Sequence, residues 1–182
     1  MTARFFADTN IAVYALDADL QRRDRALAIM RQRPVISTQV INEFISVLIG
    51  KKRVPRDVVN RFAHILLRRC EVVALTQPVV ETAIEIGVRY RCSHWDALVV
   101  AAALLAGCDT LFSEDLQDGQ IFEGRLTVKN PFTPHANSQF GGSLQDLALT
   151  PSPSSPRRRS AVPELGAELL PPASKASTDE PS

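Results

Sequence analysis

The sequence has no apolar run long enough to cross a membrane, and it has few cysteines. Its longest run without a charged or hydrogen-bonding side chain, residues 97–107, is well short of the roughly 20 residues that a membrane-spanning helix needs. The N-terminal segment MTARFFADTN lacks the long apolar region and the cleavage site of a signal peptide. The three cysteines, Cys70, Cys92 and Cys108, show no CxxC spacing, which argues against a disulfide framework and a cysteine zinc site. We therefore expect a cytoplasmic protein without a membrane partner.

Several motifs of catalysis and nucleotide binding are also missing. The chain contains neither a Walker A motif nor a GxGxxG motif. Its three histidines, His64, His94 and His135, are scattered, so a histidine-based nucleophile triad is not indicated. No internal repeat is visible. The acidic residues therefore stand out as the candidates for chemistry.

Composition divides the chain into two parts. Residues 1–132 hold 17 Lys and Arg against 15 Asp and Glu, whereas residues 133–182 hold 4 against 5. The second part also contains 8 of the 12 prolines, within segments such as PSPSSPRRRS, and it shows no sustained periodicity. Such a composition is typical of disorder. We predict one domain over residues 1–132 and a disordered Pro/Ser-rich tail over residues 133–182.

Hydrophobic patterning in the first part alternates between short apolar runs and amphipathic stretches. The runs predict strands over residues 4–8, 35–37, 71–75, 109–113 and 126–128. The amphipathic stretches predict helices over residues 11–16, 19–33, 39–52, 56–69, 78–90 and 93–106. Thr38 is expected to cap the helix over residues 39–52. This alternation favours an α/β fold, with a parallel sheet covered by helices on both faces.

The most informative stretch is SHWDALVVAAALLAGCDTLFSEDLQDGQ, residues 93–120. Its helix is apolar all round from residue 97 to residue 106, which predicts burial on several sides. Asp96 lies near the start of this helix, and the strand that follows it runs into the acidic pair Glu114 and Asp115. A carboxylate at the end of a buried helix costs free energy unless a positive partner meets it.

Four acids are candidates for a shared site, and each has a structural alternative. Asp8 could simply cap the helix after the first strand. Asp96 could complete an S-x-x-D capping box with Ser93. Asp115 could lie beside a helix dipole, and Glu43 could occupy a solvated helix face. Residue type alone leaves these alternatives open.

Considered together, the acids favour a metal site. Asp8 and Asp115 follow strands, so both belong to the carboxyl edge of the predicted sheet, where ligands of open α/β folds bind. Asp96 begins a helix near one rim of that sheet. Converging carboxylates repel each other, and a hard divalent cation such as Mg²⁺ or Mn²⁺ relieves that repulsion. Such ions assist phosphodiester cleavage, so the pattern indicates metal-dependent phosphoryl chemistry.

Four segments resemble the PIN-domain family and, more narrowly, VapC-type toxins of type II toxin–antitoxin systems. They are ADTNIAVYALD (7–17), STQVINEFISVLIGKK (37–52), HWDALVVAAALLAGCDTLFSEDLQDGQ (94–120) and VKNPF (128–132). The resemblance implies a PIN-like fold with about five parallel strands and helices on both faces. It also implies Mg²⁺-dependent endonucleolytic cleavage of RNA, with Mn²⁺ as a substitute, and restraint by a cognate antitoxin. We further expect a homodimer.

The resemblance carries over to individual residues of this sequence. The family's metal-binding, catalytic acids match Asp8, Glu43, Asp96 and Asp115, with Asp8 and Asp96 as the principal ligands. Its supporting polar residues match Thr9, Asn10 and Ser113, and Asp118 is a further candidate helper. The tail over residues 133–182 matches nothing in the family.

Two surfaces are predicted around the site. Basic residues expected to contact RNA phosphates are Arg22, Arg23, Arg25, Lys51, Lys52, Arg53 and Arg56. Apolar residues expected to help form a groove for an antitoxin are Leu20, Leu27, Ile45 and Leu48. The alternative to cleavage is a PIN-like protein that binds nucleic acid or a partner without cutting.

Overall fold

The structure, a computed structural model, describes residues 4–133. The strands are β1 (Phe5–Ala7), β2 (Val35–Ser37), β3 (Glu71–Val73), β4 (Thr110–Phe112), β5 (Ile121–Phe122) and β6 (Leu126–Lys129). The helices are α1 (Thr9–Tyr14), α2 (Leu20–Met30), α3 (Thr38–Gly50), α4 (Arg56–Arg69), α5 (Gln77–Tyr90) and α6 (His94–Leu105). Except for Thr133, the tail predicted to be disordered lies outside the described residues.

The sheet confirms the predicted α/β class. Its strand order is β3-β2-β1-β4-β6-β5, and every neighbouring pair is parallel except β5 with β6, which is antiparallel. The five predicted strands are all present. The sixth, β5, was not predicted because it is only two residues long and pairs through a tight hairpin. Positive φ angles at Glu123 and Gly124 let the chain reverse direction there.

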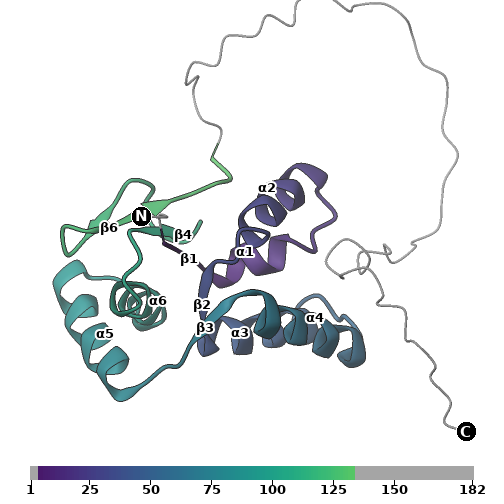
Figure 1. Cartoon of the computed structure of the whole chain (residues 1–182), viewed down its shortest axis with the longest axis horizontal. Coiled ribbons are helices and arrows are strands. Elements are labelled where there is room, and N and C mark those ends of the chain that lie inside the picture. Colours follow the sequence, from purple (N-terminus) through teal and green to yellow (C-terminus); the bar gives the residue numbers. More distant parts are fainter. Residues whose placement is uncertain (1–3, 134–182) are drawn as a thin grey trace, which may run out of the picture. The chain divides into compact units, whose positions relative to one another are not determined.

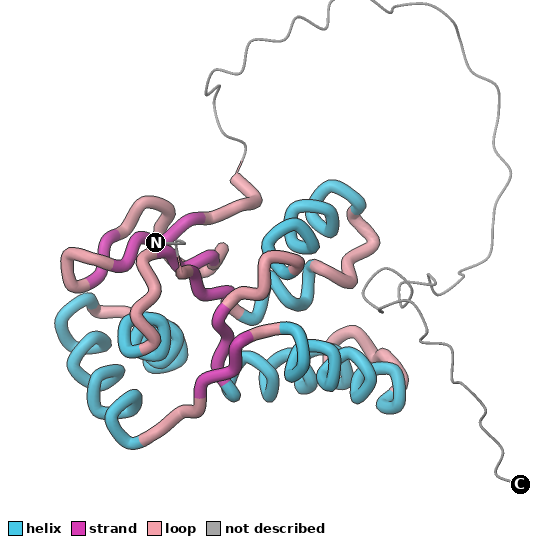
Figure 2. The backbone as a smooth tube through the Cα atoms, in the orientation of Figure 1, coloured by secondary structure: helices cyan, strands magenta, loops and turns pink. Residues whose placement is uncertain are grey.

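Helices cover both faces of the sheet, as expected (Figures 1 and 2). Helices α5 and α6 lie on one side of the strands, and α1 to α4 lie on the other. Helix α6 packs against both α5 and β2, and every residue from Ala97 to Leu104 is buried. The prediction of a buried apolar helix is confirmed. No helix in the described range is long and apolar enough to span a bilayer.

The start of α3 differs from the prediction by one residue. The helix begins at Thr38, and Ser37 caps it by accepting a hydrogen bond from the Val40 backbone N–H at 3.4 Å. The Thr38 hydroxyl instead accepts the backbone N–H of Leu75 at 3.2 Å. Thr38 was therefore wrongly expected to be the cap. The reason is that Ser37, the last residue of β2, keeps extended backbone angles, so the change from strand to helix follows it at once.

Helix α2 is shorter than the predicted range of residues 19–33. Asp19 lies outside the helix and caps it, because its Oδ1 accepts the Gln21 N–H at 2.9 Å. At the other end the helix stops at Met30, and Arg33 adopts a left-handed conformation with φ of 58° before Pro34. The turn that leads into β2 therefore begins earlier than the proline suggests.

Helix α5 exposes an apolar stripe on its outer face. Val80, Ile84 and Val88, each one turn from the next, are 38%, 56% and 78% exposed. Val79, Ala83 and Ile86 on the same helix are buried. Helix α5 therefore carries more apolar surface than its contact with α6 uses.

Candidate functional site

The candidate site begins where β1 and β4 end. These strands are parallel neighbours, with Ala7 opposite Phe112, so the next residue of each lies at the same edge of the sheet. Ser113 Oγ donates to Asp8 Oδ2 at 2.7 Å, and both side chains are buried, at 0% and 7% exposure. The register of two strands distant in sequence therefore brings these two side chains together.

Asn10 links Asp8 to Asp115. Its amide nitrogen lies 3.2 Å from Asp8 Oδ2 and 3.1 Å from Asp115 Oδ2, so one side-chain donor serves two carboxylates. The backbone N–H of Asp115 donates to Ser113 Oγ at 3.2 Å. Asn10 is in the first turn of α1, which begins directly after Asp8. Two of the four predicted acids thus share one hydrogen-bond network.

Glu43 joins the network from α3. Thr9 Oγ1 donates to Glu43 Oε2 at 2.8 Å, and the Thr9 backbone N–H donates to Asp8 Oδ1 at 2.6 Å. Gln39, one turn before Glu43, donates from Nε2 to Glu43 Oε1 at 2.8 Å. Sequence reasoning did not identify Gln39. The available signal was its i,i+4 spacing to Glu43 on a helix.

The three linked acids form a locally negative site. The pKa of Asp8 is raised to about 6 from an ordinary 3.8, mainly because burial disfavours the charged carboxylate. Hydrogen bonds from Ser113 and Thr9 lower this pKa, and the charges of Asp115 and Glu43 raise it. Within residues 4–133, no ion pair involves Asp8, Glu43 or Asp115. Protein side chains therefore organise these carboxylates without neutralising them.

Asp96 is not hydrogen-bonded to the other three acids. Ser93 caps α6, and its Oγ accepts the Asp96 backbone N–H at 3.1 Å and donates to Asp96 Oδ2 at 2.7 Å. This is the local pairing that the S-x-x-D alternative foresaw, with the serine hydroxyl rather than its backbone N–H meeting the carboxylate. The role of Asp96 as a metal ligand stays a prediction.

Asp118 has a partner away from the acids. Its Oδ1 accepts the backbone N–H of Asn130 at 2.8 Å, which ties the loop after β4 to the end of β6. Asp118 was predicted to assist the site, but within the described range it forms no hydrogen bond to the acid network. The observed bond gives Asp118 a structural role.

The sequence matches the PIN domain family over residues 5–117, which is more than half of the chain. This chain belongs to the PIN domain family. Proteins of this family are typically nucleases, and they generally use a divalent metal.

Solved structures share the fold of this PIN domain at low sequence identity. VapC20 of Mycobacterium tuberculosis, a toxin that cleaves the sarcin–ricin loop, is 23% identical with a TM-score of 0.50, over 59% of this chain and 86% of that one. A toxin–antitoxin complex from Klebsiella pneumoniae is 23% identical with a TM-score of 0.51, over 71% and 98%. FitAcB of Neisseria gonorrhoeae is 18% identical with a TM-score of 0.53, over 70% and 97%. No curated protein matches the chain.

The chemistry of the donor set in this PIN domain fits a hard divalent cation. Its side chains supply carboxylate and amide oxygens, which Mg²⁺ and Mn²⁺ prefer. Two buried oxygens, Asn10 Oδ1 and Gln39 Oε1, have no hydrogen-bond partner among the described residues. Yet no cluster of three or more His, Cys, Asp or Glu side chains in that range is arranged to hold a metal as it stands. The oxygens suit the ion, but the carboxylates are not gathered into a coordination shell.

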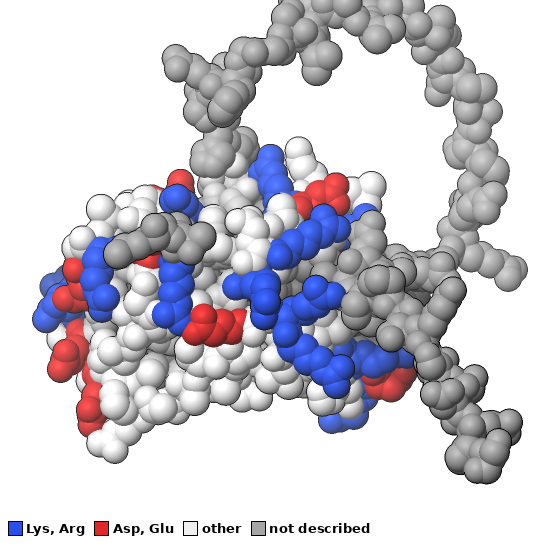
Figure 3. Space-filling view, in the orientation of Figure 1, with Lys and Arg blue, Asp and Glu red and all other residues white. Residues whose placement is uncertain are grey.

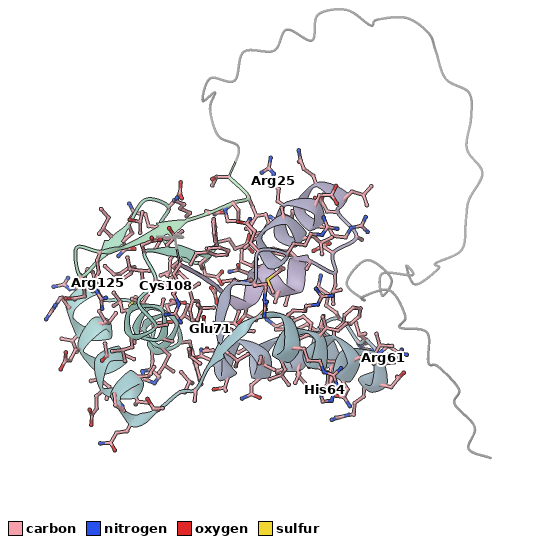
Figure 4. All side chains as sticks on the ribbon, in the orientation of Figure 1. Arg25, Arg61, His64, Glu71, Cys108 and Arg125 are labelled. Carbon is pink, nitrogen blue, oxygen red and sulfur yellow. The ribbon has the colours of Figure 1, made fainter. Side chains whose placement is uncertain are left out.

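Lys and Arg side chains gather over the half of the molecule built from α1 to α4 (Figure 3). Arg25, labelled in Figure 4, donates from Nη1 to the Pro131 carbonyl at 3.2 Å. Lys51, Lys52, Arg53 and Arg56 are all exposed, and Lys52 pairs with Asp17 at 3.5 Å. The residues at the turn between α3 and α4 are therefore the best placed of the predicted RNA contacts.

Arg22 is engaged within the protein, and it was predicted to contact RNA. Its guanidinium lies 4.7 Å from the centre of the Tyr14 ring and 5.7 Å from that of Phe132. It also pairs with Glu114 at 3.8 Å, and the Tyr14 hydroxyl donates to the same carboxylate. Glu114 precedes Asp115, so Arg22 and Tyr14 anchor the turn that carries an acid of the site.

Two of the apolar residues predicted to form an antitoxin groove are buried and cannot contact a partner. Leu27 and Leu48 are buried in the core, because they lie on the inward stripes of α2 and α3. Leu20 is exposed at the start of α2, and Ile45 is half-buried. The assignment of Leu27 and Leu48 to a docking surface was therefore wrong.

Proposed function

We propose that this PIN domain is a divalent-metal-dependent endoribonuclease and the toxin of a toxin–antitoxin pair. The observation that carries the proposal is the network at the carboxyl edge of the sheet. There Asp8, Glu43 and Asp115 share neutral hydrogen-bond donors and lack any ion pair among residues 4–133. Uncompensated carboxylates at this edge of an α/β fold are what a hard cation requires.

Each residue of the site has a role in this proposal. Asp8 and Asp96 are the principal ligands of Mg²⁺, or of Mn²⁺ as a substitute, and Glu43 and Asp115 complete the site. Bound Mg²⁺ would supply an activated water and would offset negative charge on the scissile phosphate. Ser113 and Asn10 hold Asp8 in place.

RNA binding is assigned to the basic surface over α2 to α4. The exposed Lys51, Arg53 and Arg56 would contact phosphates, together with Lys52 once it leaves Asp17. Arg23 would add a further basic side chain from α2. Arg22 contributes by holding the turn before Asp115. Phosphate contacts of this kind give affinity without sequence preference.

Two protein partners complete the proposal. The resemblance to VapC-type toxins supports a cognate antitoxin that covers the acidic site. The stripe on α5 supports a homodimer, because Val80 and Val88 lie at equal spacing on either side of Ile84. With a twofold axis through Ile84, Val80 of one copy would lie against Val88 of the second copy, and Val88 against Val80.

Incubation of a labelled RNA with the full-length chain tests the proposed activity. In Mg²⁺ or Mn²⁺ the RNA should be cut internally, and EDTA should stop the cutting. The competing function is a PIN-like protein that binds nucleic acid without cleavage, favoured by the pairing of Asp96 with Ser93 and by the lack of a preformed metal-binding cluster among the described residues. RNA that is retained by the chain and stays intact in both cations would support that alternative.

A further inference from the structure

Gln39 is a buried polar side chain to which the proposed reaction gives no role. It lies in the first turn of α3 and is only 5% exposed. Its amide nitrogen donates to Glu43, but its amide oxygen has no partner among the described residues. A buried amide with half of its hydrogen-bonding capacity unmet costs free energy. Fold stability alone therefore gives little reason for this residue at this position.

Glu43, the residue to which Gln39 donates, accepts a hydrogen bond at each of its two carboxylate oxygens. Gln39 Nε2 lies 2.8 Å from Glu43 Oε1, and Thr9 Oγ1 lies 2.8 Å from Glu43 Oε2. A glutamate has several rotatable bonds, so one donor would leave its carboxylate free to turn. Two donors from two helices define the orientation of the carboxylate group. With Thr9 alone, Glu43 would be oriented at only one oxygen.

Both donors to Glu43 are neutral. An amide and a hydroxyl fix the direction of a carboxylate but leave its negative charge in place, whereas Lys or Arg would cancel that charge. Within residues 4–133, Glu43 forms no ion pair. This arrangement suits a carboxylate whose charge is reserved for a cation, because partners that orient a ligand tune the affinity for its metal.

We propose that Gln39 is a positioning residue that orients Glu43 for binding a divalent cation. The inference rests on the proposed metal-dependent function and adds a residue to it. Helix α5 provides a matched pair for comparison, since Gln77 Nε2 donates to Glu81 Oε1 at 2.7 Å with the same i,i+4 spacing. That pair is exposed and involves none of the site residues. The two glutamines therefore differ in setting and share their local geometry.

Titration of the full-length chain with Mn²⁺ alone tests the proposal, with the free ion measured by electron paramagnetic resonance. Gln39→Met replaces the amide with an apolar side chain of similar shape. The Mn²⁺ dissociation constant should rise about tenfold or more, as for other residues that orient metal ligands. The melting temperature without metal should stay near the wild-type value, because removal of the buried, unpaired amide oxygen offsets the lost hydrogen bond to the half-buried Glu43. Gln77→Met should leave Mn²⁺ affinity unchanged.

A double-mutant cycle shows whether Gln39 acts through Glu43. In a Glu43→Gln background, Gln39→Met should weaken Mn²⁺ binding no further, since the carboxylate that it orients is absent. Wild-type affinity in Gln39→Met would overturn the proposal. An equal loss of Mn²⁺ affinity in both backgrounds would also overturn the proposal, and so would a Gln39→Met chain that is unfolded at the titration temperature. Either result would show that Gln39 supports the fold rather than the orientation of Glu43. A wild-type chain that binds no Mn²⁺ would overturn the proposed function itself, and this inference with it.

Discussion

Ser113 Oγ donates a 2.7 Å hydrogen bond to Asp8 Oδ2 from the end of a neighbouring parallel strand. Both side chains are buried, and the residues are 105 positions apart in sequence. The bond stabilises the carboxylate form of Asp8, yet burial still raises its pKa to about 6. The folded protein without metal therefore holds this carboxylate against a net free-energy cost at neutral pH.

The free energy of unfolding should depend on pH through Asp8. Its folded-state pKa of about 6 lies above the ordinary 3.8, so its stabilising effect is complete below pH 3.8 and is lost as the pH rises through 6. Asp8→Asn lacks this titration. Its stability relative to wild type should therefore rise across that window, by roughly 3 kcal/mol in total. Urea unfolding in EDTA from pH 4 to pH 7.5 measures the difference, and a pH-independent difference would contradict the assignment.

The substitution Asp96→Asn distinguishes a role of Asp96 in the helix cap from a role as a metal ligand. Asn keeps the backbone N–H that Ser93 accepts, so the metal-free chain should lose at most about 1 kcal/mol through the missing charge near the helix N-terminus. Mn²⁺ should stabilise the variant much less than wild type, and RNA cleavage should fall by orders of magnitude. Melting curves with and without Mn²⁺ and one cleavage assay decide the matter. Full metal stabilisation and full activity would leave Asp96 as a cap only.

The turn between α3 and α4 should contribute to RNA affinity through phosphate contacts. Lys51→Gln combined with Arg56→Gln should weaken binding and lower the slope of log affinity against log salt by about 1.4, or roughly 0.7 for each contact with a single strand. Arg89→Gln combined with Arg91→Gln removes the same charge at the end of α5, on the other side of the sheet. This control should keep the wild-type slope. Equal slopes for both double variants would place the RNA elsewhere.

The exposed stripe on α5 should be a dimer surface. Ile84→Lys places a charge at its centre and should convert the dimer to a monomer in sedimentation equilibrium. Leu105→Lys is the matched control, because Leu105 is 52% exposed against 56% for Ile84 and lies at the end of another helix. It should remain dimeric. A monomeric wild type, or a dimeric Ile84→Lys variant, would remove α5 from the interface.

Local patterns predicted the elements of the fold but not every partner within it. The burial of α6 followed from a run without polar side chains, and strand ends placed Asp8 and Asp115 at one edge. The cap at Ser37 was missed because a strand passes directly into a helix there. Gln39 was missed because a local pattern shows neither its burial nor its unpaired oxygen.

The residues expected to contact RNA were harder to predict from the sequence than the acidic residues of the candidate site. Arg22 was expected on the RNA surface because it is a basic residue of a charged helix face. Its partners within the domain, Tyr14, Glu114 and Phe132, come from three separate segments that only the tertiary structure brings together, and its contact with RNA stays a prediction. The sequence predicted that the acids converge, and Asp8, Glu43 and Asp115 do lie in one hydrogen-bond network, while their part in metal binding stays a prediction. For Asp96 the S-x-x-D pattern had left a capping role open, and the hydrogen bonds between Ser93 and Asp96 match that alternative.

The central claim is that the acid network is a site for a divalent cation, and thermal melting of wild type and Asp8→Asn at pH 7.5 tests it most directly. In EDTA the variant should melt above wild type, because it no longer holds a buried carboxylate with a raised pKa. In Mn²⁺ at about 1,000 times its dissociation constant the order should reverse, since the ion stabilises wild type by about 4.1 kcal/mol, more than the roughly 3 kcal/mol cost of the buried carboxylate, and stabilises the variant far less. Equal effects of Mn²⁺ on both proteins, or no effect on wild type, would contradict the claim.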